Sequence, residues 1–284
     1  MPISTSLSTK ICDQEVFHSV DKLVTGLAFD IHNEYGQFLD ERLYQSELAA
    51  RLSEKGLSVE KELRVTLTLE DFSRDYYADF LINKGIIIET KTAEILTKAH
   101  KAQTLNYLFL CGLNHGTLLN FRTERVQHQF VSTSISNEER YLFEWNLKDW
   151  KPLSERCEML LKILERSLED WGTRLDPILY RDVITHFLGG ELEVIRDIEV
   201  GSRYGSPGTQ SVYLVTPKIG FSVTAAIHHP ESIKDINFAF LTILHYMRFI
   251  GSIWQDRLFP SALFSVDRMI LKSIILSLYV LTKS

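Results

Sequence analysis

One predicted hairpin, residues 76–91, constrains the fold of this chain most strongly. Its two arms are of strand length and rich in Ile, Leu, Phe and Tyr, and Asn83-Lys84-Gly85 separates them. This combination is typical of a hairpin turn, in which Gly85 is expected to take the positive φ. The sequence therefore predicts two adjacent antiparallel strands, with residues 57–69 forming a further strand just before them.

Three charged side chains are predicted to meet at the open end of this hairpin. If Ile82 pairs with Ile86, Asp79 lies opposite Glu89, and Lys91 shares the face of Glu89 because it follows two residues later. Two carboxylates on adjacent strands can hold a divalent cation such as Mg²⁺, and a neighbouring lysine can stabilise charge on a phosphate. The alternative is an ordinary solvated sheet face, but the run before Glu89 is too apolar for one.

Composition narrows the class of protein. Of 284 residues, 45% are apolar and 24% are charged, which is typical of a soluble globular protein. The net charge of −6 argues against a protein that is basic overall, so any nucleic-acid site would be a local basic groove. The spacing of three cysteines fits neither a metal site nor a disulfide framework, which favours a reducing cytoplasm. No signal peptide is indicated, and residues 1–15 are expected to be a loose leader.

The rest of the first half alternates between helical and strand patterns. Helices are predicted at 15–31, 39–55 and 96–111, and two further strands at 117–121 and 126–131. This order predicts a small mixed α/β domain. The apolar stretch 269–281 contains Lys272 and is too short to span a membrane, so it is expected to be a buried closing helix.

Part of this domain resembles a known family. The segment Gly36–Tyr44 resembles the signature of the bacterial GxxExxY proteins, which belong to the PD-(D/E)XK nuclease superfamily. The resemblance covers about residues 25–130 and continues in order through Asp79, Glu89-Thr90-Lys91, Gln103, Asn106-Tyr107 and Asn120-Phe121. Two positions depart from the family pattern: Phe38 stands where a glycine is usual, and Ala78 precedes the aspartate in place of proline.

The resemblance implies a restriction-endonuclease-like mixed sheet flanked by helices and a metal-dependent nuclease activity. Asp79, Glu89 and Glu41 would hold Mg²⁺ or Mn²⁺, Lys91 would lie beside the scissile phosphate, and Gln103 would be the polar group that follows the motif. The implied partner is nucleic acid, with DNA favoured over RNA, and no membrane. The alternatives are that Glu41 is a capping or surface charge and that Gln103 is a buried amide bonded to backbone.

The second half of the chain repeats the pattern of the first. Residues 172–180 match residues 36–44 at five of nine positions, and every apolar position of 57–65 is apolar again in 192–200. Two apolar runs and a helix carrying His245-Tyr246 follow, which predicts tandem domains at 16–135 and 152–284. The alternative is a coincidence of α/β patterning.

The predicted second copy lacks the charged residues of the first. Pro177 takes the place of Glu41, and Val212, Ser222 and Thr224 take those of Asp79, Glu89 and Lys91. The copy would therefore serve as a structural or substrate-binding partner. In the predicted loop 201–210, Arg203 and Tyr204 could contact phosphate and base, unless this loop is simply solvated.

Three functions remain open from the sequence. The first is a cytoplasmic nuclease with one active domain. The second is a nucleic-acid-binding or regulatory protein that keeps the nuclease fold without turnover. The third is an assembly protein, in which the repeat builds an interface, as a homo-oligomer or as a pseudo-dimer within one chain.

Overall fold

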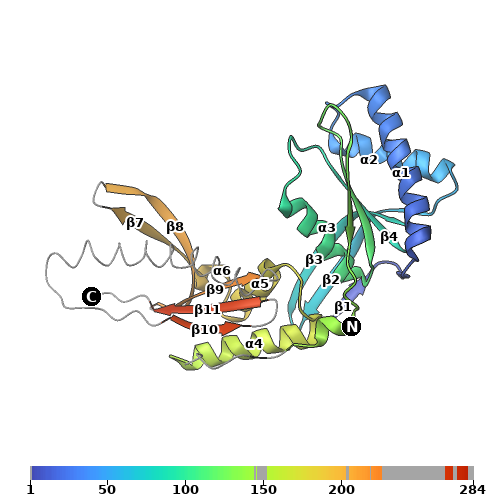
Figure 1. Cartoon of the computed structure of the whole chain (residues 1–284). Helices are drawn as coiled ribbons and strands as arrows, with labels where there is room; N and C mark the ends of the chain where they lie inside the picture. The colour runs from blue at the N-terminus through green and yellow to red at the C-terminus, as the bar shows by residue number, and fades with distance from the viewer. Residues whose placement is uncertain are drawn as a thin grey trace. The chain divides into compact units, whose positions relative to one another are not determined.

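The computed structural model of the chain describes residues 2–143, 145, 152–202, 205–217, 219–225, 266–270 and 274–280. The chain divides into two compact units, residues 1–140 and 141–284, each containing helices and a sheet (Figure 1). The predicted α/β class is confirmed by the sheet and helices of the N-terminal unit. The tandem-copy organisation stays a prediction.

The N-terminal unit is, in the part of the chain described, a six-stranded mixed sheet with helices. Its elements are β1 (Ile3–Thr5), α1 (Gln14–Tyr35), α2 (Glu41–Glu54), β2 (Val59–Leu69), β3 (Phe72–Ile82), β4 (Ile86–Lys91), α3 (Lys98–Cys111), β5 (His115–Asn120), β6 (Gln127–Ser132) and the short η1 (Glu138–Tyr141). The strands lie in numerical order across the sheet. Only β4 and β5 are parallel neighbours among them, because α3 crosses over between the two.

Helices cover both faces of this sheet. Side chains of α1 and α2 pack in one buried cluster with Ile86 and Ile88 of β4. Ile87 points to the opposite face, where a Cβ added at Gly116 would lie 3.4 Å from both Ile87 Cβ and Leu108 Cδ2 of α3. Because side chains alternate along a strand, the later residues of β4 that share the face of Ile87 also lie on the α3 side.

The turn of the β3–β4 hairpin differs from the sequence prediction. The left-handed residues are Asn83, with φ of 49°, and Lys84, with φ of 61°, whereas Gly85 is not left-handed. Asn83 is fitted to this conformation because its side-chain oxygen accepts a hydrogen bond from Ser58 N at 2.9 Å. Gly85 is needed for space instead: a Cβ there would lie 2.6 Å from the carbonyl oxygen of Lys10.

The N-terminal segment is bound to the sheet, so the prediction of a loose leader is wrong. Strand β1 pairs antiparallel with β2, which would otherwise expose an edge of unpaired backbone groups. Further along, Lys10 N donates to Lys84 O at 2.8 Å, and Thr9 Oγ1 donates to Cys111 O at 2.9 Å. The leader thus contributes to the backbone pairing of this unit.

The C-terminal unit begins with helices and continues into an antiparallel sheet. Its described elements are α4 (Glu155–Trp171), α5 (Pro177–Phe187), α6 (Glu191–Val194), β7 (Ile195–Ser202), β8 (Gly205–Thr216), β9 (Ile219–Ala225), β10 (Val266–Ile270) and β11 (Ile274–Val280). The strand order is β10-β11-β9-β8-β7, and each described neighbour pair is antiparallel. The parallel pair of the first sheet therefore has no counterpart among these described strands.

Two predictions for the C-terminal unit are wrong. The expected closing helix 269–281 contains parts of β10 and β11 instead, because residues 274–280, IILSLYV, are rich in β-branched and aromatic side chains. The expected loop 201–210 is largely the extended ends of β7 and β8. The predicted helix with His245-Tyr246 lies outside the described residues.

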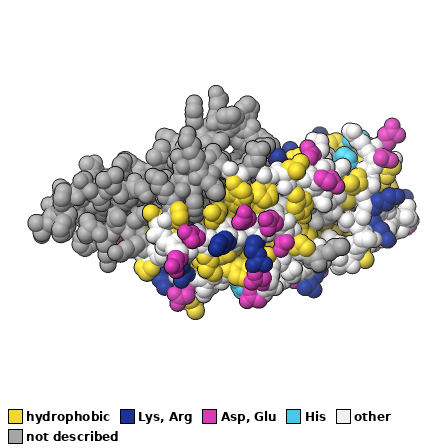
Figure 2. All heavy atoms as spheres, turned by 90° about the horizontal axis from the view of Figure 1, so that it is seen from below, with side chains coloured by type: hydrophobic (Ala, Val, Ile, Leu, Met, Phe, Trp, Pro, Cys, Tyr) yellow, Lys and Arg dark blue, Asp and Glu magenta, His cyan; other side chains and the backbone are white. Residues whose placement is uncertain are grey.

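Two surface observations concern partners. Among the helices that the structure describes, none combines the length and apolar character needed to cross a membrane. Acidic and basic side chains are interspersed on the face shown in Figure 2. Neither sign of charge dominates this face, which is consistent with a net charge of only −6 for the whole chain.

Candidate active site

The β3–β4 hairpin has the predicted register. Ile82 pairs with Ile86 and Phe80 pairs with Ile88, so the next position brings Asp79 opposite Glu89. At this position a side chain takes part in the pairing, since Asp79 N donates to Glu89 Oε1 at 3.0 Å. The two carboxylate residues are therefore joined directly across the strands.

Glu89 is fully buried, with 0% of its side chain exposed, and it contacts Lys91 on the same face of β4. The distance from Lys91 Nζ to Glu89 Oε2 is 3.2 Å. Burial, aided by the negative charge of Asp79, raises the pKa of Glu89 to about 8 despite the opposing charge of Lys91. Burial thus favours the protonated form of Glu89 below about pH 8, and a cation bound at this site would compete with that proton.

Lys91 remains an ammonium ion in this environment. Burial alone would lower its pKa, but the charges of Glu89 and Asp79 outweigh burial and raise the pKa above its ordinary value. A lysine held in this state can donate hydrogen bonds and stabilise negative charge, but it cannot accept a proton.

The carboxylate of Asp79 is oriented by residues that the sequence analysis did not select. Asp79 Oδ2 accepts hydrogen bonds from Thr90 N at 2.7 Å and from Thr90 Oγ1 at 2.8 Å. Gln45 of α2 donates in turn to Thr90 Oγ1 at 2.9 Å. Strand alternation places Thr90 on the opposite face from Glu89, which is why the pattern did not reveal it. The only signal in the sequence was its position between Glu89 and Lys91.

Glu41 lies in the first turn of α2 and reaches the same region. Its Oε2 accepts a hydrogen bond from Thr92 N, just after β4, at 3.0 Å. Burial raises the pKa of Glu41, and the charges of Lys91 and Asp79 act on it in opposite directions. Glu41 is therefore electrostatically coupled to the hairpin, which a residue that only caps the helix at the surface would not be.

Gln103 and Tyr107 lie on α3. Gln103 Nε2 donates to Tyr107 OH at 3.3 Å, and the Gln103 side chain is exposed. Tyr107 is buried, and its pKa is raised by that burial and by the charge of Glu89. The described hydrogen bond of Gln103 is thus to a tyrosine near the carboxylates and not to a carboxylate. The other two predicted site residues, Arg203 and Tyr204, lie outside the described residues.

The donor set suits a hard divalent cation, although the side chains are not arranged around one. Asp79, Glu89 and Glu41 offer carboxylate oxygens, the ligands that Mg²⁺ prefers. Over the described residues, no group of three or more His, Cys, Asp or Glu side chains is positioned to hold a metal ion. The described hydrogen bonds use only Oδ2 of Asp79 and Oε2 of Glu41, which leaves one oxygen of each for a ligand. The chemistry fits, and binding would require the side chains to turn toward the metal.

Comparison with known proteins finds a family match within the N-terminal unit. Residues 18–132 match the family model described as the PD-(D/E)XK nuclease superfamily, which confirms the resemblance at the level of the superfamily. The comparison with curated proteins found no match. A solved structure described as the crystal structure of SSO0001 is 18% identical, covers 47% of this chain and 71% of that chain, and has a TM-score of 0.27. This TM-score is too low to indicate a shared fold.

Proposed function

We propose that the N-terminal unit is a metal-dependent nuclease that hydrolyses phosphodiester bonds in nucleic acid, with DNA favoured over RNA. The observation that carries this proposal is the pairing of Asp79 with Glu89 across the hairpin, with Lys91 bound to Glu89, inside the region that matches the nuclease superfamily. Glu41 supports it because its pKa responds to both Lys91 and Asp79.

Each residue has a defined part in the proposed mechanism. Asp79, Glu89 and Glu41 would hold Mg²⁺ or Mn²⁺, which when bound lowers the pKa of an attacking water and stabilises charge on the phosphate. Thr90 orients the Asp79 carboxylate through two hydrogen bonds. Lys91, kept protonated by its neighbours, stabilises the negative charge that develops on the phosphate. Gln103 would orient the Tyr107 side chain, which lies on the α3 side of the site, through its hydrogen bond to the Tyr107 hydroxyl.

Features of the C-terminal unit support its being a diverged copy without this chemistry. Tyr180 OH donates to Gly172 O at 2.5 Å, as Tyr44 OH donates to Gly36 O at 2.6 Å, across the same spacing of eight residues. The two glycines have φ of 75° and 73°. A tyrosine at the corresponding position thus bonds the connection between the first two helices of each unit.

The strand register of the C-terminal hairpin supports the loss of the site. Tyr213 pairs with Phe221, as Phe80 pairs with Ile88, which aligns Val212 with Asp79 and Ser222 with Glu89. Neither replacement can supply a carboxylate. The copy would then act as a structural or substrate-binding partner, with Arg203 and Tyr204, which lie outside the described residues, as candidate nucleic-acid contacts.

A second candidate is a nucleic-acid-binding or regulatory protein, or an assembly protein, that keeps the fold without turnover. The observation in its favour is that protein donors already bind each carboxylate: Asp79 by Thr90, Glu89 by Lys91 and Glu41 by Thr92. Such a site can be stable without a metal.

Cleavage assays separate the two candidates. Purified wild type is incubated with Mg²⁺ or Mn²⁺ and with plasmid DNA, single-stranded DNA or RNA, beside Asp79→Asn and Lys91→Met. We expect cleavage by the wild type that both variants lose while their far-UV spectra stay unchanged. Asp75→Asn is the matched control, because Asp75 is a carboxylate on β3 that binds Arg64. Cleavage that survives in both Asp79→Asn and Lys91→Met would refute the proposed mechanism.

A further inference from the structure

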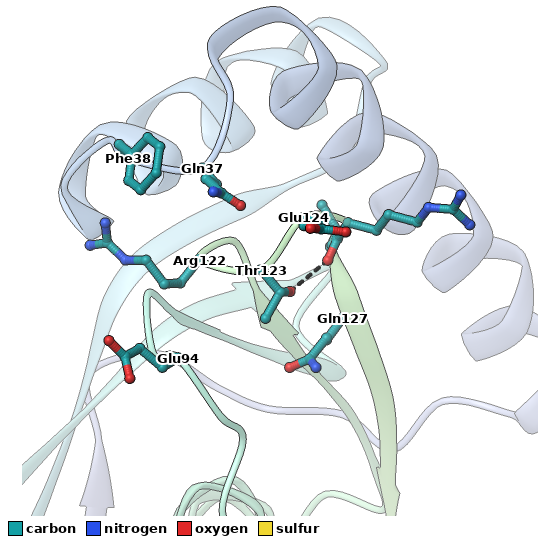
Figure 3. A pocket seen from close by; sticks show the side chains of 9 residues that line it. Gln37, Phe38, Glu94, Arg122, Thr123, Glu124 and Gln127 are labelled. Atoms are coloured by element: carbon teal, nitrogen blue, oxygen red, sulfur yellow. Dashed lines mark hydrogen bonds between the residues drawn. The ribbon is translucent and has the colours of Figure 1, made fainter.

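A surface cavity of about 690 Å³, widely open to solvent, lies on the N-terminal unit. Its lining comes from the α1–α2 connection, from the segment after β4 and from the β5–β6 connection (Figure 3). Its lining includes the side chains of Gln37, Phe38, Arg122, Thr123 and Gln127. None of these is assigned a part in the proposed mechanism.

Phe38 presents an aromatic ring at this cavity with 77% of the residue exposed. The connection that carries it is tethered on both sides of Phe38: Tyr44 OH donates to Gly36 O at 2.6 Å and accepts from Leu39 N at 3.2 Å. The backbone conformation is therefore set by a buried tyrosine and not by packing of the phenylalanine. A large apolar ring held in water in this way is a platform for stacking.

The polar groups of the cavity suit a neutral, hydrogen-bonding ligand. Gln127 Oε1 accepts from Asn120 Nδ2 at 3.0 Å, so its Nε2 can donate into the cavity. Thr123 Oγ1 donates to Arg125 O at 2.6 Å and can still accept. The lining charges also balance, because two arginines accompany two glutamates. An anion alone gains little from such a lining, whereas a nucleobase has a ring to stack and an edge with donors and acceptors.

The cavity is connected to the candidate site through the segment after β4. Thr92 N donates to Glu41 Oε2 at 3.0 Å, and Thr92 O accepts from Arg122 Nε at 3.4 Å. Ala93 is held from both sides, because its N donates to Asn120 Oδ1 at 2.9 Å and its O accepts from Asn120 Nδ2 at 2.7 Å. A carboxylate of the site and the wall of the cavity are thus fixed to the same three-residue stretch.

We propose that Phe38 stacks on an unpaired nucleobase of the substrate strand, next to the phosphate that is cut, and that Gln37 and Gln127 bind the edge of this base. This inference rests on the proposed nuclease function. It specifies the substrate further, because a base within a duplex is stacked on its neighbours and cannot enter the cavity. The preferred substrate is therefore single-stranded or locally unpaired nucleic acid.

The test measures binding without cleavage. A fluorescein-labelled single-stranded oligonucleotide and the same sequence as a duplex are titrated with wild type, Phe38→Ala and Phe38→Trp in EDTA. We expect Phe38→Ala to weaken single-strand binding about 5- to 100-fold, Phe38→Trp to retain it, and duplex binding to stay unchanged. Phe29→Ala, an exposed phenylalanine of α1, is the matched control and should bind as wild type.

A second readout tests stacking directly. With 2-aminopurine in the oligonucleotide, wild type should quench the fluorescence of the stacked base, and Phe38→Ala should not. Equal binding by wild type and Phe38→Ala, or an equal loss for single strand and duplex, would overturn the inference. If Mg²⁺-dependent cleavage persists in that case, the nuclease proposal is retained and only the base-stacking inference is rejected. Quenching by a wild type that cuts no substrate would support the base site and refute the nuclease proposal.

Discussion

Glu89 Oε1 accepts a hydrogen bond from the backbone N–H of Asp79 at 3.0 Å, so a buried carboxyl group takes the place of a backbone acceptor between two strands. This hydrogen bond favours the charged form of Glu89, but burial and the negative charge of Asp79 outweigh it and raise the pKa of the group. The side chain of Glu89 is fully buried next to Asp79, and its charge is offset in part by Lys91 and by the Asp79 N–H group. Protonation of Glu89 and binding of a cation are two ways to relieve the same excess of negative charge.

The first prediction concerns pH. The pKa of Glu89 is raised from 4.5 to about 8 in the folded protein, so the folded state binds a proton that the unfolded state releases. The resulting stabilisation is fully present below about pH 4.5 and is lost as the pH rises through about 8. Without metal, the unfolding free energy should fall by roughly 2–4 kcal/mol over this range. Urea unfolding in EDTA at pH 5–9 measures it.

Glu89→Gln is the decisive variant for this prediction, because it keeps the shape of the side chain and removes its titration. Its unfolding free energy should depend less on pH than that of the wild type. Glu47→Gln, which changes a surface glutamate paired with Arg51, should keep the wild-type dependence. An identical pH dependence in wild type and Glu89→Gln would contradict the assignment.

The second prediction concerns metal. Mg²⁺ or Mn²⁺ should raise the melting temperature of the wild type, because a ligand that binds only the folded state stabilises it. The rise should be larger at pH 8.5 than at pH 6.5, since the metal displaces the proton of Glu89. Asp79→Asn should lose the rise and Asp75→Asn should keep it. A rise that persists in Asp79→Asn would place the cation elsewhere.

The sequence predicted the register of the hairpin because a short loop and two apolar arms leave few ways to pair Ile82 with Ile86. It could not predict Thr90, since strand alternation turns this residue away from Glu89, and only the reach of the Asp79 side chain brings the two together. The position of Glu41 depends on the path of the α1–α2 connection, which the residue pattern does not determine.

Two local errors have physical explanations. Glycine adopts a positive φ most readily, which favours Gly85 for that conformation, but Asn83 and Lys84 take it and Gly85 supplies space. The apolar run 269–281 is compatible with a helix, because short apolar runs do not distinguish a buried helix from a buried strand. Its β-branched and aromatic content was the better guide.

The third prediction tests whether the Thr90 hydroxyl orients the Asp79 carboxylate for metal binding. Thr90→Val removes the hydroxyl that donates to Asp79 Oδ2 and keeps the volume and the backbone N–H. Groups that orient a metal ligand typically contribute about 10- to 100-fold to metal affinity. We expect a loss of that order in the Mn²⁺ titration of thermal stability. The loss of unfolding free energy should be roughly 1–2 kcal/mol. Wild-type metal affinity in Thr90→Val would show that the hydroxyl does not position the carboxylate.

The fourth prediction concerns the N-terminal segment. Gly85→Ala would bring a Cβ within 2.6 Å of Lys10 O, and Lys10 cannot move away without disturbing the hydrogen bond from its N to Lys84 O. We expect a loss of about 1–3 kcal/mol in unfolding free energy and faster proteolysis before residue 12. Gly26→Ala is the matched control: it lies in α1 with nothing within 4 Å of the added Cβ. That change should stabilise by about 0.5–1 kcal/mol. Resistance of Gly85→Ala to proteolysis equal to wild type would contradict the contact.

The fifth prediction links the tethered connection to binding of single strands. Tyr44→Phe removes the hydroxyl that bonds Gly36 and Leu39 on either side of Phe38, without changing Phe38 itself. We expect a loss of roughly 1–2 kcal/mol in unfolding free energy and weaker binding of single-stranded DNA. The binding loss should be smaller than that of Phe38→Ala, because the ring remains but is less well placed.

Tyr180→Phe is the control for this prediction, since Tyr180 makes the same bond to Gly172 in the other unit and is equally buried. It should destabilise its own unit by a similar amount and leave single-strand binding at the wild-type value. Fluorescence anisotropy with the labelled oligonucleotide measures binding, and urea unfolding measures stability. If both variants weaken binding to the same extent, general destabilisation explains the loss, and the tether of Phe38 has no particular part in binding. If only Tyr44→Phe does so, the orientation of the ring matters, because that variant alone loosens the connection that presents it.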